Sequence, residues 1–464
     1  MARFYIQQFG CRATQADGAA IERQLLDRGC TAAPSPESAD VVVLNTCTVT
    51  AAADAQARQA IAGLWAQRRE ARVIVTGCYA QRAPEELAAL PGVLAVVGNS
   101  HKPQLADLLG PRPGASAPGS DFVSASRLLA SAAGTGQPAA IFAGDIFART
   151  DFLAAPVLGG EGDHTRPTLK IQDGCNNRCT FCVIPFVRGR SRSLPPGGVV
   201  AEVGRLVSAG HREIVLSGIN LGAWGRDLAP RGHFPDLLQR ILAETEVQRL
   251  RLSSIEPLDV TRDLIELFAS SPRLADHFHM PLQSGADPVL AAMHRWYRAE
   301  HYARRVELIA ERLPGAAIGA DVIAGFPGET EDDHARTLDF IRQRPFAYLH
   351  VFSYSARPGT RAAGRPGLPP AVIRRRAREL RALGERKAAE FFAAQAGRRL
   401  SVLTLRRRRP GSDSDAWTPG LSSNYLKVRV SGAWPPNRFV AVHGPADPAA
   451  LAAPLPASAV RGTR

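Results

Sequence analysis

The sequence predicts an α/β protein with an N-terminal parallel α/β sheet domain, a central partial (β/α)6 barrel and a small C-terminal β module. Two observations predict this organisation. Short apolar runs alternate with helical patterns in two separate series, and a further strand-rich segment follows a strongly basic stretch. A β-α-β order implies parallel strands joined by right-handed crossovers. The 464 residues also suit about three domains at roughly 150 residues each.

The first series spans residues 1–108 and predicts the N-terminal domain. Apolar runs typical of short buried strands occupy residues 4–10, 41–46, 73–77 and 93–97. Helical patterns, with apolar residues three or four positions apart, cover residues 18–28 and 54–69. The next residues, 109–165, are rich in Pro, Gly, Ala and Ser, which predicts a linker with one short helix.

The second series spans residues 166–395 and predicts the barrel. Strands are expected at residues 168–172, 213–217, 249–255, 277–282, 318–323 and 348–353. Helices are expected between them at residues 197–209, 234–244, 260–270, 287–311 and 330–342. Six βα units within about 190 residues favour an open, partial barrel over the eight-unit form, with the active site at the carboxyl ends of the strands.

The remaining residues predict a basic helix, a β module and a tail. Residues 371–409 hold thirteen Lys/Arg and three Asp/Glu, a local +10 within the total of +14, and residues 372–395 suit a helix. The module covers residues 396–446, with strands expected at 400–405, 425–430 and 439–443 and a charged hairpin at 406–415. Residues 447–464 are rich in Ala and Pro and are expected to be poorly ordered.

Composition and charge exclude some classes of protein. The hydrophobic and charged fractions, 45% and 22%, are those of a globular chain and exclude wholesale disorder. No apolar run approaches the roughly 20 residues of a membrane span, and the start lacks a signal-peptide core, so we expect a cytoplasmic protein with no membrane partner. The net charge of +14 indicates an anionic partner, most commonly nucleic acid.

All seven cysteines lie within the first 182 residues. In a cytosolic chain of this length they are not expected to form a disulfide framework. Cys11, Cys47 and Cys78 each follow a predicted strand, and the carboxyl ends of parallel strands share one edge. Taken singly, each is more often a small buried hydrophobe than a ligand, but their equivalent positions predict three converging thiols. Cys30 lies near the end of a predicted helix and is not included in this set of converging thiols.

Cys175, Cys179 and Cys182 form a C-x3-C-x2-C run directly after the first barrel strand. Three such thiolates can hold three corners of a four-iron cluster and leave the fourth iron open to a small molecule. A zinc site would normally need a fourth Cys or His at ligand spacing, and none lies next to this run. The spacing therefore favours an iron–sulfur site over zinc.

This loop on a partial barrel resembles that of the radical S-adenosylmethionine (radical SAM) enzymes. The resemblance implies that the open iron binds the amino and carboxylate groups of S-adenosylmethionine, whose reductive cleavage gives a 5′-deoxyadenosyl radical. It also implies that Phe181 touches adenine and that other cofactor contacts end the second, third and fifth barrel strands, although each alone is equally a strand-end turn. Those contacts are Ser217, Gly218, Asn220, Ser254, Glu256, Ile323 and Gly325.

The N-terminal motifs resemble those of the radical SAM methylthiotransferases, over about residues 1–395. They are Gly-Cys at 10–11, Asn-Thr-Cys-Thr-Val-Thr at 45–50 and Thr-Gly-Cys-Tyr at 76–79, with related segments at 169–174, 184–193, 279–285, 321–329 and 353–360. The resemblance implies two [4Fe-4S] clusters and S-adenosylmethionine as cofactors. Cys175, Cys179 and Cys182 would hold the radical-generating cluster. Cys11, Cys47 and Cys78 would hold the auxiliary cluster that carries the incoming sulfur.

Members of this family act on isopentenyladenosine in tRNA, on threonylcarbamoyladenosine in tRNA, or on an aspartate of a ribosomal protein. The form of residues 45–50 and 171–177 is most similar to the threonylcarbamoyladenosine branch. The implied reaction places a methylthio group on C2 of that nucleoside at position 37, in the anticodon loop. The sequence names neither the electron donor nor the sulfur source.

Two further features concern RNA binding. Arg188, Arg190 and Arg192 follow the cysteine loop and are interpreted as phosphate contacts, the alternative being a solvated basic loop. The C-terminal module occupies the place of the family's RNA-binding TRAM domain, but it is short and divergent.

The competing class is a non-enzymatic iron–sulfur protein that binds RNA or senses redox state. Such a protein would need no open iron and no cofactor motifs at successive strand ends.

Overall fold

The structure is a computed structural model that describes residues 2–69, 72–109, 139–153, 165–406, 417–453 and 455. The chain divides into two compact units. Unit 1 consists of Met1–Val157, Asp173–Arg192 and Ser355–Ala363, and unit 2 consists of Leu158–Gln172, Ser193–Tyr354 and Gly364–Arg464. Within the described ranges, no helix combines the length and apolar character needed to cross a membrane.

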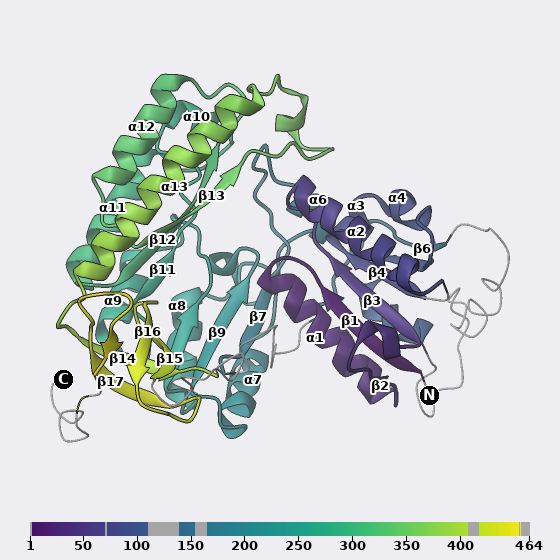
Figure 1. Cartoon of the computed structure of the whole chain (residues 1–464), viewed down its shortest axis with the longest axis horizontal. Coiled ribbons are helices and arrows are strands. Elements are labelled where there is room, and N and C mark those ends of the chain that lie inside the picture. The colour runs from purple at the N-terminus through teal and green to yellow at the C-terminus, as the bar shows by residue number, and fades with distance from the viewer. Residues whose placement is uncertain are drawn as a thin grey trace. The chain divides into compact units, whose positions relative to one another are not determined.

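Unit 1 is built on a six-stranded sheet whose paired strands are all parallel, in the order β2-β1-β3-β4-β5-β6 (Figure 1). The strands are β1 (Arg3–Gln8), β2 (Thr31–Ala32), β3 (Val41–Thr46), β4 (Val73–Gly77), β5 (Val93–Gly98) and β6 (Ala140–Phe142). Helix α1 (Arg12–Asp27) and the 3-10 helix η2 (Lys102–Leu108) pack on one face. Helices α2 (Ala51–Gln67), α3 (Cys78–Arg82) and α4 (Pro84–Ala88) pack on the other.

The four predicted strands of this unit are confirmed, and two others were not predicted. Strand β2 has two residues, too few to show a pattern. Strand β6 lies within the segment expected to be a linker, where three residues pair in parallel with β5. Helix α1 begins six residues before the predicted start. The prediction missed its first turns because Thr14 and Asp17 are polar residues on the buried face, so the apolar pattern is interrupted there. Residues 143–153 of the expected linker are also described and include the short 3-10 helix η3 (Ile146–Ala148), whereas residues 110–138 and 154–164 lie outside the described residues.

Unit 2 contains the predicted βα series, with its parallel strands in two groups (Figure 1). One sheet has the order β10-β9-β7-β8 and the other β11-β12-β13, and isolated bridges from Leu250 to Leu274 and from Ser254 to His279 join them. The strands are β7 (Thr168–Asp173), β8 (Arg192–Ser193), β9 (Glu213–Gly218), β10 (Arg249–Leu252), β11 (His277–His279), β12 (Ala317–Ala324) and β13 (Tyr348–Ser353). This is the partial barrel that the sequence predicts.

The barrel helices match the prediction except at one place. They are α7 (Pro196–Ser208), α8 (Phe234–Glu244), α9 (Arg262–Ser270), α10 (Asp287–Ala292), α11 (Ala299–Arg312) and α12 (Glu331–Arg342). The prediction of a single helix at 287–311 is wrong, because the helical conformation is interrupted between α10 and α11. His294 adopts a positive φ of 58°, which no helix tolerates, and the apolar pattern on both sides hides the break.

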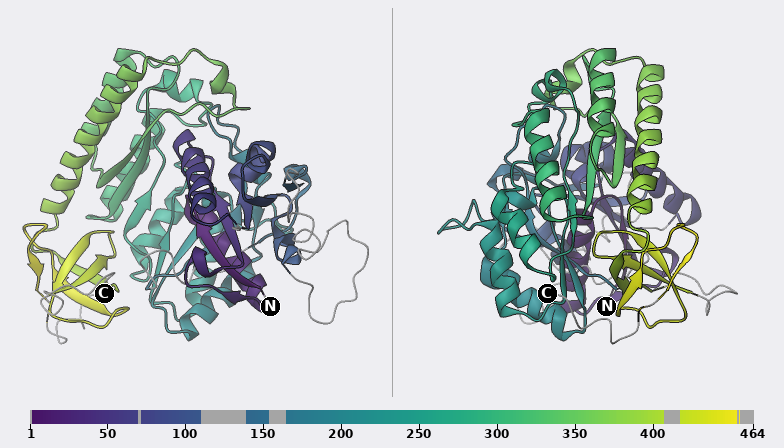
Figure 2. Two further views of the ribbon diagram at one scale, coloured as in Figure 1. Left: turned by 45° about the vertical axis from the view of Figure 1, so that its right-hand side comes forward. Right: turned by 90° about the vertical axis from the view of Figure 1, so that its left-hand side faces the viewer.

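The C-terminal part of unit 2 consists of helix α13 (Pro370–Ala393) and a five-stranded sheet. Helix α13 packs along β12 and β13 (Figure 2). The sheet has the order β17-β14-β15-β16-β18, with strands β14 (Arg399–Thr404), β15 (Trp417–Ser422), β16 (Lys427–Ser431), β17 (Phe439–His443) and β18 (Leu451–Ala452). Strands β15 and β18 were not predicted, and β18 corrects the expectation that residues 447–464 are poorly ordered throughout, since it pairs with β16. The expected charged hairpin lies mostly outside the described residues.

Candidate functional site

Three cysteines gather at one edge of the sheet of unit 1. Cys11 follows β1 and precedes α1, Cys47 follows β3 directly, and Cys78 begins α3 directly after β4. Strands β1, β3 and β4 are neighbours in the parallel sheet, so their carboxyl ends adjoin. The predicted convergence of the three strand ends is therefore observed, and we call Cys11, Cys47 and Cys78 the cysteine triad.

Two glycines allow the close approach within the triad. Gly10 has a φ of +96°, and a Cβ there would lie 2.4 Å from Cβ of Cys47 and 2.9 Å from its sulfur. Gly77 has a φ of +103°, and a Cβ there would lie 2.2 Å from the carbonyl oxygen of Thr46. Any other residue at either position would displace the neighbouring strand end.

Two of the three thiols of the triad lie out of water, since Cys47 and Cys78 are buried whereas Cys11 is exposed. Burial, followed by the charges of Cys78 and Cys11, raises the pKa of the Cys47 thiol to about 12. Such thiols give up their protons together when a metal centre takes them as thiolates. Asn99 supports this role because its Nδ2 lies 3.5 Å from the Cys78 sulfur and donates to the carbonyl oxygen of Val187 at 2.7 Å.

A buried charge network lies beside the triad. The Asp17 carboxylate accepts from Lys102 Nζ at 2.8 Å and from Arg188 Nη2 at 3.0 Å, and Arg188 Nη1 donates to Asp173 at 2.9 Å. Although burial opposes it, the charge of Asp17, followed by those of Cys78, Asp173 and Cys11, holds the pKa of Arg188 above its ordinary value. The interpretation of Arg188 and Arg192 as phosphate contacts is therefore wrong, since both side chains are buried within unit 1. Of the three arginines only Arg190 is exposed.

The C-x3-C-x2-C loop belongs to the same unit. Gly174 opens it with a φ of +72°, and a Cβ there would lie 2.0 Å from the carbonyl oxygen of Arg190. Within the loop, the Cys175 amide donates to the Gly189 carbonyl at 3.1 Å and the Cys182 amide donates to the Cys179 carbonyl at 3.1 Å. All three thiols are partly exposed.

The residues after the loop connect it to the triad. They form α6 (Ile184–Arg188), and Val183 and Val187 pack against Cys78 in one apolar cluster. A pocket of about 200 Å³ next to the loop is lined by Cys179, Cys182, Phe147, Phe186 and Arg361, among others. The loop is thus held by its own hydrogen bonds while two of its thiols face an open space.

The donor sets fit iron–sulfur clusters better than single metal ions. Among the described residues, the only three ligand atoms of His, Cys, Asp or Glu that all lie within 4.8 Å of one another belong to His279, Asp321 and His350. The cysteine sets are less compact, as suits a cluster in which each thiolate binds a different iron. Each set supplies three soft sulfur donors, which also fits a [4Fe-4S] cluster whose fourth iron is open.

The predicted contacts to S-adenosylmethionine in unit 2 all lie at the carboxyl ends of barrel strands. Ser217 and Gly218 end β9, and Ser254 and Glu256 follow β10. Ile323 lies near the end of β12, and Gly325 directly follows that strand. Asn220 lies close to β9, and its backbone N–H donates to Oε1 of the buried Gln172 at 2.7 Å. Phe181 lies between two loop cysteines in unit 1. Their contact with the cofactor stays a prediction.

Two of these positions have defined surroundings. Glu256 pairs with Arg295, and burial raises the pKa of its carboxyl group. Gly325 has a φ of +77°, and its amide donates to Glu329 at 2.8 Å.

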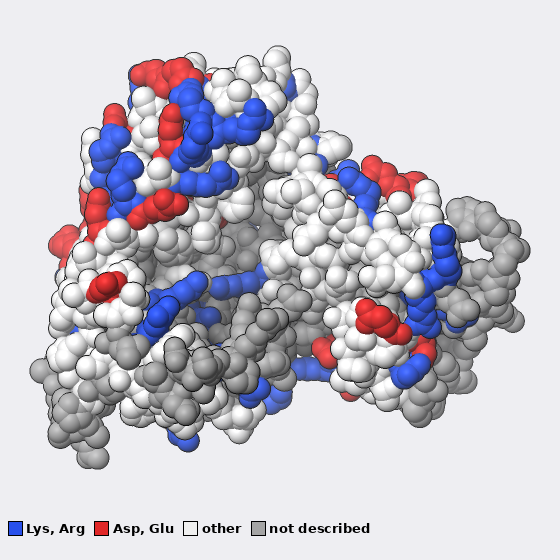
Figure 3. Space-filling view, viewed as in Figure 1, with Lys and Arg blue, Asp and Glu red and all other residues white. Residues whose placement is uncertain are grey.

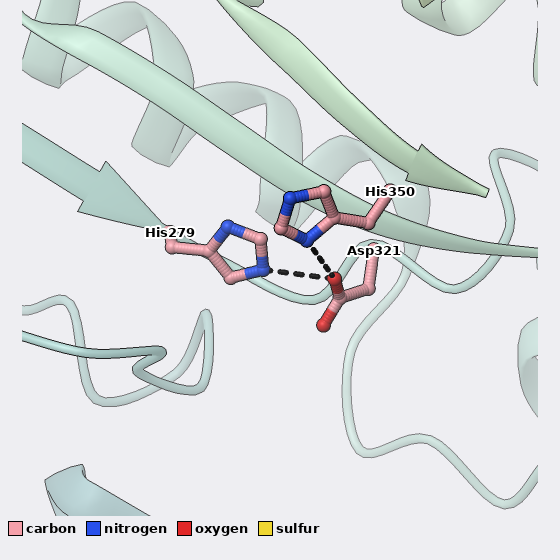
Figure 4. Close-up of side chains that lie close together, drawn as sticks. All are labelled: His279, Asp321 and His350. Carbon is pink, nitrogen blue, oxygen red and sulfur yellow. Dashed lines mark hydrogen bonds and ion pairs between the residues drawn. The ribbon is translucent and has the colours of Figure 1, made fainter. Parts of the chain in front are cut away.

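The His279, Asp321 and His350 side chains were not identified as a group from the sequence. They point toward one another from β11, β12 and β13 (Figure 4). His279 and Asp321 lie in segments that resemble the family, but their proximity depends on sheet register. No spacing in the sequence could reveal it.

Two arginines of the +10 segment form ion pairs with nearby acidic residues. Arg375 pairs with Glu331 and Glu379, and Arg376 pairs with Glu329 and Glu331. Figure 3 accordingly shows Lys and Arg next to Asp and Glu over α12 and α13.

Comparison with known proteins extends these observations. Residues 3–98 match the uncharacterized protein family UPF0004, and residues 169–341 match the radical SAM superfamily. The chain is 35% identical to the threonylcarbamoyladenosine tRNA methylthiotransferase MtaB of Aquifex aeolicus, over 92% of this chain and 96% of the relative. It is 36% identical to the tRNA-2-methylthio-N(6)-dimethylallyladenosine synthase of Syntrophobacter fumaroxidans, over 80% of this chain and 77% of the relative.

A solved structure confirms the fold class. The radical S-adenosylmethionine methyltransferase TsrM from Kitasatospora setae, with cobalamin and a [4Fe-4S] cluster bound, superposes with a TM-score of 0.54. The superposition covers 78% of this chain and 77% of the TsrM chain at 17% sequence identity, so the likeness concerns the fold alone.

Proposed function

The chain belongs to the radical SAM tRNA methylthiotransferase family, and from this premise we propose that it adds a methylthio group to C2 of N6-threonylcarbamoyladenosine at position 37 in the anticodon loop of tRNA. Membership makes it an enzyme that uses S-adenosylmethionine and [4Fe-4S] clusters. It also removes the competing class, a non-enzymatic RNA-binding or sensor protein.

The observation that carries the proposal is the presence of two separate sets of three cysteines in unit 1. In the proposal, Cys175, Cys179 and Cys182 hold the cluster that receives S-adenosylmethionine, and the cysteine triad holds the auxiliary cluster. Once bound, these groups supply the radical that removes the C2 hydrogen and the sulfur and methyl that replace it. A C–H bond on this ring has no leaving group for a polar substitution, so radical chemistry suits the substrate.

The chain's own residues hold and shield these groups. Gly10 and Gly77 leave room for the triad, and Asn99 directs an N–H toward the Cys78 sulfur. Arg188 and Lys102 place two buried positive charges next to thiolates that would otherwise repel one another. In the proposal this network lowers the electrostatic cost of gathering three thiolates, two of which are buried.

The choice of threonylcarbamoyladenosine rests on two supports. The first is the relative of that name, which matches nearly the full length of both chains. The second is the form of residues 45–50 and 171–177, which is most similar to that branch. Dimethylallyladenosine is the second candidate substrate because a relative with that activity in its name has a similar identity, 36%.

A substrate comparison tests the proposal. The reconstituted enzyme is incubated anaerobically with reductant, sulfide, S-adenosylmethionine and tRNA that carries either modified adenosine, and the nucleosides are identified by mass spectrometry. We expect the methylthio product on the threonylcarbamoyl substrate alone. Product on the dimethylallyl substrate alone would contradict the proposed substrate while keeping the enzyme class.

A further inference from the structure

We propose that His279, Asp321 and His350, named here the His–Asp–His site, bind the polar group on N6 of the target adenosine. This inference rests on the proposed function, since it assigns the threonylcarbamoyl group a binding partner within unit 2. It identifies His350 and Asp321 as the residues that distinguish a polar N6 substituent from an apolar one.

Strand register brings the three side chains together. His279 pairs with Gly319 across β11 and β12, and Asp321 pairs with His350 across β12 and β13. Three adjacent parallel strands therefore present the three side chains on one face. Nε2 of His279 lies 2.9 Å and Nδ1 of His350 lies 3.2 Å from the same oxygen, Oδ1 of Asp321 (Figure 4).

The hydrogen bonds around the site have a definite direction. An ionised carboxylate only accepts, so both imidazoles donate to Asp321. Although burial opposes it, these two hydrogen bonds keep the pKa of Asp321 well below its ordinary value. The other nitrogen of His279 lies 2.9 Å from the Tyr348 hydroxyl, which also lies 2.8 Å from Nε2 of His277. A neutral His279 accepts from this hydroxyl, and its two ring nitrogens are then fully used.

Two polar atoms of the site remain for a ligand. Within the described part of the chain, Oδ2 of Asp321 and Nε2 of His350 have no hydrogen-bond partner. Both are accessible, because the His350 side chain is 56% exposed and that of Asp321 is 23% exposed. The carboxylate oxygen accepts from an N–H or O–H group, and the imidazole accepts when neutral or donates to an anion when protonated.

This pair of atoms matches the chemistry of a threonylcarbamoyl group. That group carries urea N–H groups, a hydroxyl and a carboxylate, so it offers both donors and acceptors. A dimethylallyl group offers neither, and it would leave the polar atoms of the site without partners. The site therefore favours the polar substituent in two ways. It forms hydrogen bonds with that substituent, and an apolar substituent in its place would leave the polar atoms of the site without hydrogen bonds.

The location of the site also suits a substrate group. Ser254, a predicted S-adenosylmethionine contact, forms a bridge pair with His279. Ile323, another predicted contact, lies two residues after Asp321 on the same strand and so on the same face. An adenosine held by its N6 group at this site would lie beside the strand ends where the cofactor is predicted to bind.

The test measures RNA binding by the cluster-reconstituted enzyme. Two synthetic anticodon stem-loops differ only in whether position 37 carries N6-threonylcarbamoyladenosine or adenosine. We expect the wild-type enzyme to bind the modified stem-loop more tightly, and His350→Ala to lose about tenfold in affinity for it while its affinity for the unmodified one stays the same. Asp321→Asn should reduce the same preference.

His233→Ala is the matched control. The His233 side chain is also 56% exposed and its Nδ1 also lies 3.2 Å from an aspartate, Asp236, but it stands at the start of α8. This variant should keep the full preference for the modified stem-loop.

Three outcomes would overturn the inference. The first is His350→Ala protein that keeps the preference for the modified stem-loop. The second is wild-type enzyme that forms the methylthio product on threonylcarbamoyl tRNA but shows no preference in binding. The third is a stoichiometric divalent cation, beyond the cluster iron, that is lost in His350→Ala and would identify a metal site. Failure of the proposed function is seen separately, as product on dimethylallyl tRNA alone.

Discussion

Arg188 Nη2 lies 3.0 Å from the Asp17 carboxylate, although 171 residues separate them in the sequence. Their side chains are only 2% and 3% exposed. Asp17 belongs to the helix that follows Cys11, and Arg188 ends the short helix that follows Cys182. One ion pair thus connects the segments that carry the two cysteine sets in unit 1.

Removal of this arginine should be costly. Arg188→Met leaves the buried carboxylates of Asp17 and Asp173 without one cation, which should reduce the free energy of unfolding by about 3–5 kcal/mol. Urea unfolding followed by circular dichroism measures the effect. Arg205→Met removes an exposed pair with Glu202 and should change it by at most about 1 kcal/mol. Equal losses in the two variants would contradict the importance of the buried pair.

The glycine beside Cys47 should be required for the auxiliary cluster. In Gly10→Ala the added methyl group would overlap Cβ of Cys47, so the triad should no longer assemble. Iron content after reconstitution should fall from about eight to about four per chain, the amount of one four-iron cluster. Gly63→Ala is the control, because a Cβ there meets nothing within 4 Å. Full iron content in Gly10→Ala would show that the triad does not hold a cluster in this geometry.

Stability should fall in acid because of Glu213. Although burial opposes it, Arg251, Arg249 and Arg166 lower the pKa of this carboxyl group from 4.5 to about 2. A carboxyl group whose pKa is lowered by folding stabilises the folded state above its unfolded pKa, and this stabilisation is lost as the pH falls from about 4.5 to 2. Urea midpoints measured across this range should fall more steeply for the wild type than for Glu213→Gln. Parallel curves would contradict this assignment.

The sequence predicted the parts of the site that local patterns encode. The triad could be predicted because each of its cysteines follows an apolar strand, and the C-x3-C-x2-C loop because its cysteines are neighbours in the chain. The burial of Arg188 could not be predicted, since its partner Asp17 lies far away in the sequence. The His–Asp–His site depends on the register of three strands. Strand β6 has only three residues in a segment of linker-like composition.

The measurement that tests the central claim most directly concerns the division of work between the two cysteine sets. Cys47→Ala, Cys175→Ala and the control Cys30→Ala are reconstituted and incubated with reductant, S-adenosylmethionine and threonylcarbamoyl tRNA, and both 5′-deoxyadenosine and methylthio nucleoside are quantified. Cys30 is buried in a separate apolar cluster of unit 1 and should not affect either product. We predict that Cys175→Ala forms neither product, whereas Cys47→Ala releases 5′-deoxyadenosine but forms no methylthio nucleoside. Methylthio nucleoside formed by Cys47→Ala would contradict the assignment of the triad to the auxiliary cluster.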